Sequence, residues 1–305
     1  MDVTKVVIPA AGKGTRFLPY TKSIPKEMLP LLEKPSLQYV VEEGIACAIK
    51  NYIMITSSGK YAIEDYFDTN IELEHYLKDH NKDALLRGLE KITRNTSFTY
   101  IRQAEALGLG HAISLAQTCI QKEYFGVMLP DDIIIGKEAA LGQLIRIARQ
   151  EKGSVIAVQD VPLECVSSYG MIAIKKQITP LLFQINGLVE KPVQKDTPST
   201  LAVVGRYILS HKIFASLEHV ATYSTGEIQL TDAIAHMLHN NEKVFAYKVQ
   251  GVRYDVGTPI GWIKAIIGMA LQHPHYAHHI KNFIADLKTT DSYLYNNAKT
   301  IEHII

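Results

Sequence analysis

The sequence predicts an α/β protein built on a doubly wound sheet that becomes mixed in its second half. Over the first half of the chain, short apolar runs rich in β-branched residues alternate with longer segments of helical spacing, which is typical of parallel strands joined by helices. From Tyr169 onward the apolar runs follow one another closely and are separated by turn signals, which indicates mixed strand directions. After Thr258, apolar residues recur at helical spacing.

The strands expected in the first half are short runs without alternation, as buried strands of a parallel sheet are. They are Lys5–Ile8, Tyr52–Thr56, Phe98–Ile101, Gly126–Leu129 and Ser154–Val158. Between the first two, the segment Ser36–Ile49 places Leu37, Val40 and Ile45 on much of one face of a helix. A charged, helix-favouring stretch at residues 61–96 is expected to be a helical insertion.

The second half is expected to form a smaller lobe, rich in strands, that is continuous with the first. Its strands are predicted at Gly170–Ile174, Gln184–Glu190 and Leu201–Leu209, within a lobe at residues 169–210. A further apolar strand is predicted at Lys243–Gln250. The main domain therefore spans residues 1–257, and residues 258–305 form a helical appendage whose stripe from Trp262 to Leu271 is either core or an oligomer surface.

Composition narrows the possible partners. The chain has 305 residues, and its 32 Lys and Arg nearly cancel its 31 Asp and Glu, so no global charge attracts nucleic acid or an anionic membrane. The cysteines are isolated and lack any C-x-x-C spacing, which argues against a disulfide framework or a zinc site. No segment approaches the roughly 18 apolar residues of a membrane span. We therefore expect a cytoplasmic protein with small-molecule partners.

A loop rich in glycine, proline and cations follows the first predicted strand, at Pro9–Pro30. The loop does not match the Walker pattern, because Thr15-Arg16 stands where Lys-Ser/Thr is needed. It does not match the dinucleotide fingerprint either, because Phe17 replaces the third glycine. Its physics is still that of a phosphate cradle, since Gly12 and Gly14 allow backbone N–H groups to approach an anion. The prolines stiffen a segment carrying several cations, which favours a polyphosphate ligand over a solvent loop.

The run Ala10–Pro19, followed by Lys26–Pro30, resembles the signature of the nucleotide-sugar pyrophosphorylases, and within them it is most similar to the bacterial UTP–glucose-1-phosphate uridylyltransferases. The resemblance extends from Lys5 to about Leu271. It passes through Arg102–Ala104, Leu107–Ala112, Leu129–Asp132, Tyr169–Gly170, Val189–Pro192, Val204–Tyr207, Gly226–Asp232 and Tyr254–Gly257. It implies a Rossmann-like fold of the nucleotide-diphospho-sugar transferase type with a sugar-binding lobe.

The resemblance also implies a reaction in which UTP and glucose 1-phosphate give UDP-glucose and pyrophosphate. Two anions must meet, so the site has to neutralise charge while it holds the in-line geometry. Asp131 follows the strand Gly126–Leu129, and Asp255 follows the strand Lys243–Gln250. Carboxylates at strand ends suit Mg²⁺, and both residues match the family's metal ligands, Asp131 rather than Asp132.

The remaining site residues are assigned by their matches to the family motifs. Lys26 is expected near the α-phosphate and Arg16 on the leaving pyrophosphate, while Lys191 binds the sugar phosphate and also counts among the catalytic residues. Glu190 accepts hydrogen bonds from glucose hydroxyls, and Gly170 lets the backbone approach the sugar. The expected nucleotide-binding residues are Ala10, Ala11, Gly12, Gly14 and Thr15 in the loop, with Gln103 and Gly108 at the uracil.

Several alternatives stay open at this point. A related enzyme could use dTTP, CTP or ATP on the same sugar phosphate, although the run Lys26–Pro30 favours UTP, and a regulatory paralogue could bind nucleotide sugars without turnover. The family commonly forms dimers or tetramers, so a homodimer or homotetramer is expected. His111 is interpreted as a helix-start or packing residue, and the histidines of His273–His279 as a solvated surface segment.

Overall fold

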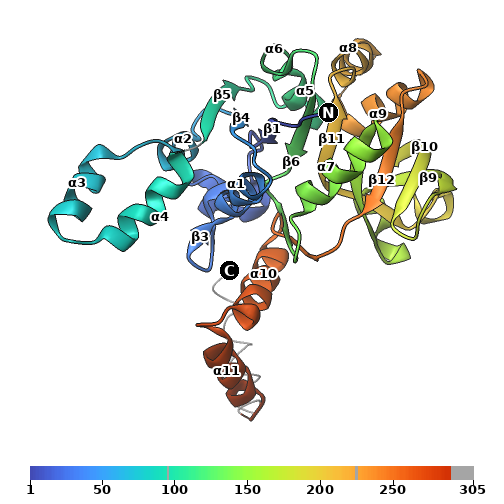
Figure 1. The fold of residues 1–305 in the computed structure, drawn as a ribbon. Coiled ribbons are helices and arrows are strands. Elements are labelled where there is room, and N and C mark those ends of the chain that lie inside the picture. The colour runs from blue at the N-terminus through green and yellow to red at the C-terminus, as the bar shows by residue number, and fades with distance from the viewer. Residues whose placement is uncertain (95, 224–225, 290–305) are drawn as a thin grey trace.

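The computed structural model describes residues 1–94, 96–223 and 226–289 (Figure 1). Its centre is a nine-stranded sheet with helices on both faces, which confirms the predicted α/β class. In spatial order the strands are β5 (Ser97–Arg102), β4 (Asn51–Thr56), β1 (Lys5–Pro9), β6 (Tyr124–Met128), β11 (Leu201–Ser210), β8 (Ser154–Asp160), β12 (Val244–Lys248), β10 (Leu182–Glu190) and β9 (Gly170–Gln177).

The sheet changes character halfway across. The neighbours β5, β4, β1 and β6 all run parallel, as the alternation of strands and helices predicts. Strand β11 then inserts antiparallel between β6 and β8, and β10 pairs antiparallel with both β12 and β9. The lobe expected at residues 169–210 is therefore part of the main sheet, because its last strand lies in the middle of that sheet.

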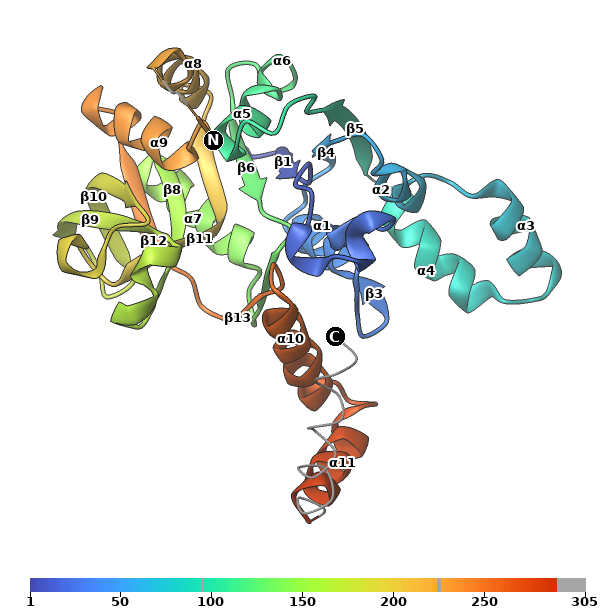
Figure 2. The same cartoon turned by 180° about the vertical axis from the view of Figure 1, so that it is seen from behind.

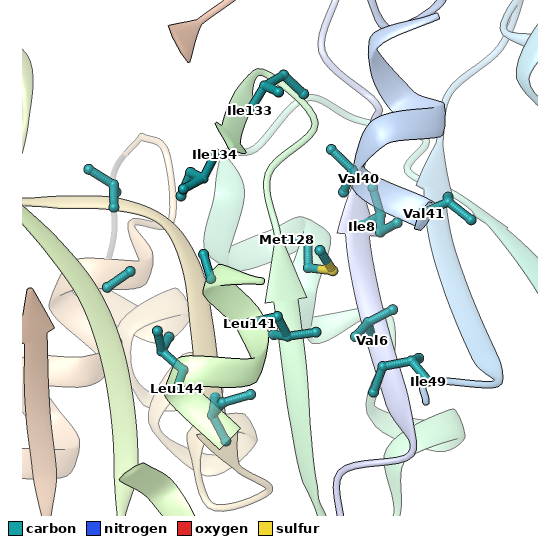
Figure 3. Packing of buried hydrophobic residues seen from close by; sticks show 14 of the residues in the cluster. Val6, Ile8, Val40, Val41, Ile49, Met128, Ile133, Ile134, Leu141 and Leu144 are labelled. Atoms are coloured by element: carbon teal, nitrogen blue, oxygen red, sulfur yellow. The ribbon is translucent and has the colours of Figure 1, made fainter. Parts of the chain in front are cut away.

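Both faces of the sheet are buried, which explains the continuous apolar runs in the sequence. Because side chains alternate along a strand, Val6 and Ile8 of β1 pack on one face, against α1 (Ser36–Ala46) and α7 (Ala140–Glu151) (Figure 3). Val7 packs on the other face, against α5 (Leu109–Ser114), α8 (Ile213–Tyr223) and α9 (Leu230–His239). The short helix α6 (Gln117–Ile120) contributes Ile120 to that second cluster.

Helices α2 (Tyr61–Phe67), α3 (Ile71–Asp79) and α4 (Asp83–Thr93) lie between β4 and β5 in the chain. In Figures 1 and 2 they extend away from the edge of the sheet as an arm. The arm is attached through aromatic contacts, since the Phe67 ring lies 4.9 Å from that of Phe98 on β5, centroid to centroid.

Helices α10 (Pro259–Gln272) and α11 (Ala277–Thr289) extend from the body in another direction (Figure 2). The side chain of Thr258 caps α10 by accepting a 3.1 Å hydrogen bond from the N–H of Gly261. In the predicted apolar stripe, Trp262 and Ile266 pack against the core, whereas Ile263 and Ile267 are exposed, so the helix serves the core on one side only. None of the helices in the described ranges has the length and apolarity that crossing a membrane requires.

Short elements outside the main sheet shape its carboxyl edge. The loop after β1 contains 3₁₀ turns at Thr15–Phe17, Tyr20–Lys22 and Lys26–Met28, then the hairpin of β2 (Pro30–Leu31) and β3 (Lys34–Pro35). Further 3₁₀ turns, at Leu163–Ser168 and Gln194–Asp196, precede β9 and follow β10. Strand β7 (Asp132–Ile135) pairs antiparallel with β13 (Val252–Asp255), which places Asp255 opposite Asp132.

Strand β13 was not predicted from the sequence, which places Asp255 after the strand Lys243–Gln250. That strand ends at Lys248, and Asp255 is instead the last residue of β13. The chain leaves the main sheet at Gln250, where the Gln143 side chain takes over the hydrogen bonds: the Gln250 N–H donates to Gln143 Oε1 at 2.9 Å, and the Gln250 carbonyl accepts from Gln143 Nε2 at 2.9 Å. The segment after the break is then free to pair with β7.

Candidate active site

Two cavities open side by side at the carboxyl end of the parallel strands, where ligands bind in open α/β sheets. The first, of about 410 Å³, is lined among others by Ala11, Gly12, Lys26, Gln103 and Gly108. The second, of about 330 Å³, is lined among others by Arg16, Gly170, Glu190, Lys191 and Asp255. Asp131 lines both cavities. Lys26, Gln103 and Gly108, expected at the nucleotide, therefore lie on the first cavity, and the residues expected at the sugar lie on the second, with Asp131 on both. Arg16, expected on the pyrophosphate, departs from this division because it lines the second cavity.

The carboxylates of Asp131 and Asp255 converge from different strands. The N–H of Val256 donates a 2.8 Å hydrogen bond to the backbone carbonyl of Asp131, which ties the end of β13 to the loop after β6. A Cβ atom placed on Gly257 would lie 3.1 Å from Asp255 Oδ1 and 3.2 Å from Asp131 Oδ2, so both carboxylates border the same point. The glycine at this position leaves that space open.

This pair of carboxylates fits Mg²⁺. The ion prefers hard oxygen ligands, and proteins usually supply one or two carboxylates while phosphates and water complete its shell. Within residues 1–94, 96–223 and 226–289, no cluster of three or more acidic, His or Cys side chains is arranged to hold a metal. A metal at this site would therefore depend on ligand oxygens as well as on Asp131 and Asp255.

Lys26 contacts the carboxylate of Asp131 directly. Its Nζ donates a 2.7 Å hydrogen bond to Asp131 Oδ2. Burial alone would lower the pKa of Lys26, but the Asp131 and Glu27 carboxylates together raise it above its ordinary value. Burial would likewise raise the pKa of Asp131, but the Lys26 ammonium outweighs burial and lowers it. Both groups therefore stay charged at neutral pH.

A buried ion pair holds the segment that carries Lys26. The adjacent residue Glu27 is buried and accepts a 2.8 Å hydrogen bond from Nζ of Lys60, which is also buried. The hydroxyl of Ser36 donates to the Glu27 backbone carbonyl at 3.0 Å, which joins this turn to the start of α1. With its neighbour fixed at both side chain and backbone, Lys26 has little freedom to move away from Asp131.

The glycine-rich loop packs on this lysine. Gly14 has a φ of 65°, a left-handed conformation that favours glycine, and an added Cβ would lie 3.3 Å from Cβ of Lys26. The N–H of Ala10 already donates a 2.7 Å hydrogen bond to the Ile55 carbonyl, so a backbone contact of Ala10 with a ligand would have to use its carbonyl. Ala10, Gly14 and Thr15 line neither of the two cavities, whereas Arg16 lines the second.

On the sugar side, Glu190 and Lys191 end strand β10 and its turn. The hydroxyl of Thr231 donates a 3.1 Å hydrogen bond to Glu190 Oε2, and a Cβ on Gly170 would lie 3.0 Å from the same oxygen. Gly170 thus makes room for the Glu190 carboxylate. Lys191 has a φ of 45°, a left-handed conformation that costs a non-glycine residue about 1–2 kcal/mol, and its N–H is held by the Tyr169 carbonyl at 3.0 Å. Such strain often occurs at functional residues.

Gln103 and Gly108 lie together on the nucleotide side. Nε2 of the buried Gln103 donates a 3.2 Å hydrogen bond to the Gly108 carbonyl and lies 3.0 Å from Nδ1 of His111. Gly108 has a φ of 96°, and an added Cβ would lie 2.9 Å from the Ile228 carbonyl oxygen. Only glycine fits a backbone that is both left-handed and this close to its neighbour.

Sequence reasoning missed Arg253, which lines the second cavity. Its Nε donates a 2.6 Å hydrogen bond to Asp132, and its guanidinium carbon lies 5.3 Å from the ring centre of Tyr169. Burial alone would lower the pKa of Arg253, but the Asp132 carboxylate outweighs this effect and raises it. The sequence could have indicated Arg253, because Arg253 precedes Asp255 by two residues. Residues two apart on a strand lie on the same face, so the two side chains are expected to point the same way.

Comparisons with known proteins place these features in context. A family model described as nucleotidyl transferase matches residues 5–270. A UTP–glucose-1-phosphate uridylyltransferase of Staphylococcus haemolyticus is 44% identical over 287 residues, which cover 94% of this chain and 99% of the relative. Among solved structures, a UTP-bound UGPase from Acinetobacter baumannii is 39% identical with a TM-score of 0.86 and covers 94% of this chain and 100% of its own. A UDP-glucose pyrophosphorylase complexed with UDP-glucose is 38% identical with a TM-score of 0.81 and covers 89% of this chain and 100% of its own.

Proposed function

This chain belongs to the nucleotidyl transferase family, and on that premise we propose that it makes UDP-glucose and pyrophosphate from UTP and glucose 1-phosphate. The observation that carries the proposal is the position of Asp131 at the junction of two cavities. One cavity presents the glycine-rich loop and Gln103, and the other presents Glu190 and Lys191. A nucleotide and a sugar phosphate bound in these cavities would meet at Asp131.

In the reaction, a phosphate oxygen of glucose 1-phosphate attacks the α-phosphorus of UTP in line with the departing pyrophosphate. The new bond joins that oxygen to the α-phosphorus, and the bond between the α-phosphorus and the bridging oxygen to the β-phosphate breaks. Lys26, kept charged by Asp131, would neutralise charge on the α-phosphate, and Arg16 would stabilise the pyrophosphate. Positioned charges are sufficient for this chemistry, so no acid–base residue is required.

The other residues would position the substrates. Lys191 would bind the phosphate of glucose 1-phosphate, while Glu190, itself held by Thr231, would accept hydrogen bonds from the sugar hydroxyls. Gln103 would contact the Watson–Crick edge of uracil, and Gly108 would let the base lie against the backbone. Ala11 and Gly12 line the nucleotide cavity and would contact base and ribose.

We infer Mg²⁺ as the cofactor, with Asp131 and Asp255 as its protein ligands. When bound, the ion would supply positive charge to the phosphate oxygens. Asp131 would serve both the ion and Lys26, because its Oδ2 already accepts the hydrogen bond from that lysine. The N–H of Gly257 donates to Asp255 Oδ1 at 2.9 Å, which orients the second carboxylate.

The proposal also covers organisation and location. Residues 1–257 would form the transferase domain, with a helical insertion at 61–96 and the sugar-binding lobe at 169–210. Residues 258–305 would form a helical appendage, of which residues 290–305 lie outside the described residues. A homodimer or homotetramer is proposed, because α10 leaves Ile263 and Ile267 exposed. A cytoplasmic location without nucleic-acid or membrane partners agrees with the balanced charge and with cysteines that are free in the structure.

The test is a pyrophosphate-release assay of the purified chain with Mg²⁺, glucose 1-phosphate and, in separate reactions, UTP, dTTP, CTP and ATP. The expected result is fastest release with UTP, and faster release with dTTP or another nucleotide would refute the uridylyl assignment. Titration with UDP-glucose is run alongside. Binding of UDP-glucose without turnover under any of these conditions would instead identify a regulatory paralogue.

A further inference from the structure

His111 does not line the nucleotide cavity, yet it contacts the one side-chain amide among the residues expected to bind the base. Gln103 lines the cavity, and its Nε2 atom has two hydrogen-bonding partners on the segment that begins α5. These partners are the Gly108 carbonyl at 3.2 Å and Nδ1 of His111 at 3.0 Å.

The chemistry of these partners determines which way the amide points. A carbonyl oxygen can only accept, so the Gln103 atom beside Gly108 must be the amide nitrogen. That nitrogen carries two hydrogens, and His111 Nδ1 lies where the second can be accepted, provided that Nδ1 carries no proton. With both hydrogens used, the part of the amide left for a ligand is Oε1, which can only accept.

We infer that His111 is a positioning residue that holds the Gln103 amide with its oxygen toward the base and so selects bases that have an N3–H donor. This inference rests on the proposed function of the site. Uracil and thymine both present N3–H, whereas N3 of cytosine is an acceptor that would face Oε1 without a hydrogen between them. His111 therefore contributes to rejecting CTP and is neutral between UTP and dTTP.

The backbone around His111 supports a positioning role. The N–H of Gly110 donates to the Ile228 carbonyl at 2.8 Å, and the N–H of Ile228 donates to the Leu107 carbonyl at 2.7 Å. Two backbone hydrogen bonds with Ile228 therefore hold the segment that carries Gly108 and His111, one before Gly108 and one between the two residues. Gln103 is also anchored, because its N–H donates to the Thr56 carbonyl at 2.8 Å and extends the pairing of β5 with β4.

The test measures dissociation constants for UTP, dTTP and CTP by calorimetry with Mg²⁺ and without sugar phosphate. His111→Leu removes the acceptor. His111→Asn restores one, because asparagine carries its oxygen on Cγ, as histidine carries Nδ1. Ser114→Ala is the matched control, since the Ser114 hydroxyl donates to the His111 backbone carbonyl at 2.8 Å and has no recorded contact with Gln103.

We expect His111→Leu to reduce the preference for UTP over CTP by about 10-fold, the effect of one orienting hydrogen bond. The UTP to dTTP ratio should stay constant, His111→Asn should recover most of the preference, and Ser114→Ala should leave both ratios unchanged. A general disruption of the pocket would instead weaken the binding of all three nucleotides by a similar factor. If His111→Leu does not fold, His111→Ala removes the same acceptor.

The inference is overturned if a folded variant without the acceptor keeps the wild-type UTP to CTP ratio within twofold, or if His111→Asn behaves like His111→Leu. It is also overturned if the wild-type chain binds UTP and CTP equally. These outcomes are separate from failure of the proposed function, which appears as absence of pyrophosphate release in the wild-type chain. Binding ratios remain measurable in that case.

Discussion

Asp131 and Asp132 are adjacent, and the same change to asparagine is expected to affect them in opposite ways. The side chain of Asp131 is 35% exposed, borders both substrate cavities and accepts a hydrogen bond from Lys26. The side chain of Asp132 is 7% exposed and points inward, where it accepts from the N–H of Gly205 at 2.7 Å and pairs with Arg253, which is 11% exposed. One carboxylate faces the chemistry and the other supports the fold.

The expected magnitudes follow from this difference. Asp131→Asn removes a charge on which Lys26 and the proposed Mg²⁺ would both depend, so turnover should fall at least about 100-fold, or about 2.7 kcal/mol of transition-state stabilisation. Its effect on the free energy of unfolding should stay below about 1 kcal/mol, because the ion pair is partly exposed and an amide oxygen can still accept from Lys26. Asp132→Asn removes the nearer carboxylate partner of the buried Arg253 guanidinium, leaving Asp255 Oδ2 at 3.9 Å, and should cost about 3 kcal/mol of stability.

The assays are urea unfolding at neutral pH and initial rates of pyrophosphate release with UTP and glucose 1-phosphate. Each variant serves as the control for the other, since both replace the same charge one residue apart. A folded Asp131→Asn protein that retains more than a tenth of the wild-type rate would remove Asp131 from the metal site. A loss of less than about 1 kcal/mol in Asp132→Asn would refute the reasoning from its buried pairing with Arg253.

Three further outcomes are expected. Lys191→Met should lower kcat/KM for glucose 1-phosphate by 10-fold or more, because a charged hydrogen bond contributes about 1.5–3 kcal/mol. The dissociation constant for UTP should stay constant. Weaker UTP binding would contradict a role limited to the sugar phosphate. Arg206→Met should lower the free energy of unfolding, measured in urea, by about 3 kcal/mol. Arg206 is 0% exposed, and its partner Glu43 would be left as a buried carboxylate without its arginine. A loss of stability smaller than that caused by replacing an exposed arginine would contradict the importance of this buried ion pair. Because the pKa of Asp131 is lowered in the folded state, its contribution to stability is complete above its unfolded pKa of about 3.9 and is lost as pH falls through the folded value. The difference in unfolding free energy between wild type and Asp131→Asn should therefore be constant from pH 6 to 8 and change only below about pH 4.

The strands of the sheet were predictable because their burial produces continuous apolar runs in the sequence. A parallel strand covered on both faces must be apolar at every position, and runs such as that of β1 are visible without any knowledge of their neighbours. The end of α1 was less visible, because the helix stops at Ala46 although the apolar pattern continues to Ile49. Ile49 remains in the core after the helix has ended, so its burial reflects tertiary packing rather than helical position.

The sequence indicates candidate site residues where they lie within one motif. The glycines and cations of the loop after β1 and the two aspartates after β6 are contiguous in sequence, so their types and spacing alone indicate a phosphate site. The contacts of Arg253 and His111 were not predicted, because each depends on a partner that the tertiary structure brings close. Arg253 meets Asp132 through the pairing of β13 with β7, and the contact of His111 with Gln103 depends on where α5 begins.

By itself, the sequence determined the alternation of buried strands and helices, the stiff cationic loop and the carboxylate after β6, because each depends on residues close together in the chain. The tertiary structure decided which carboxylates share a site, since Asp131 and Asp255 come from segments that meet only when β13 leaves the main sheet to pair with β7. It also decided that Asp132 is turned inward and that the Gln103 amide has a defined direction. Both depend on hydrogen-bond partners distributed over several elements, whose relative positions no local pattern encodes.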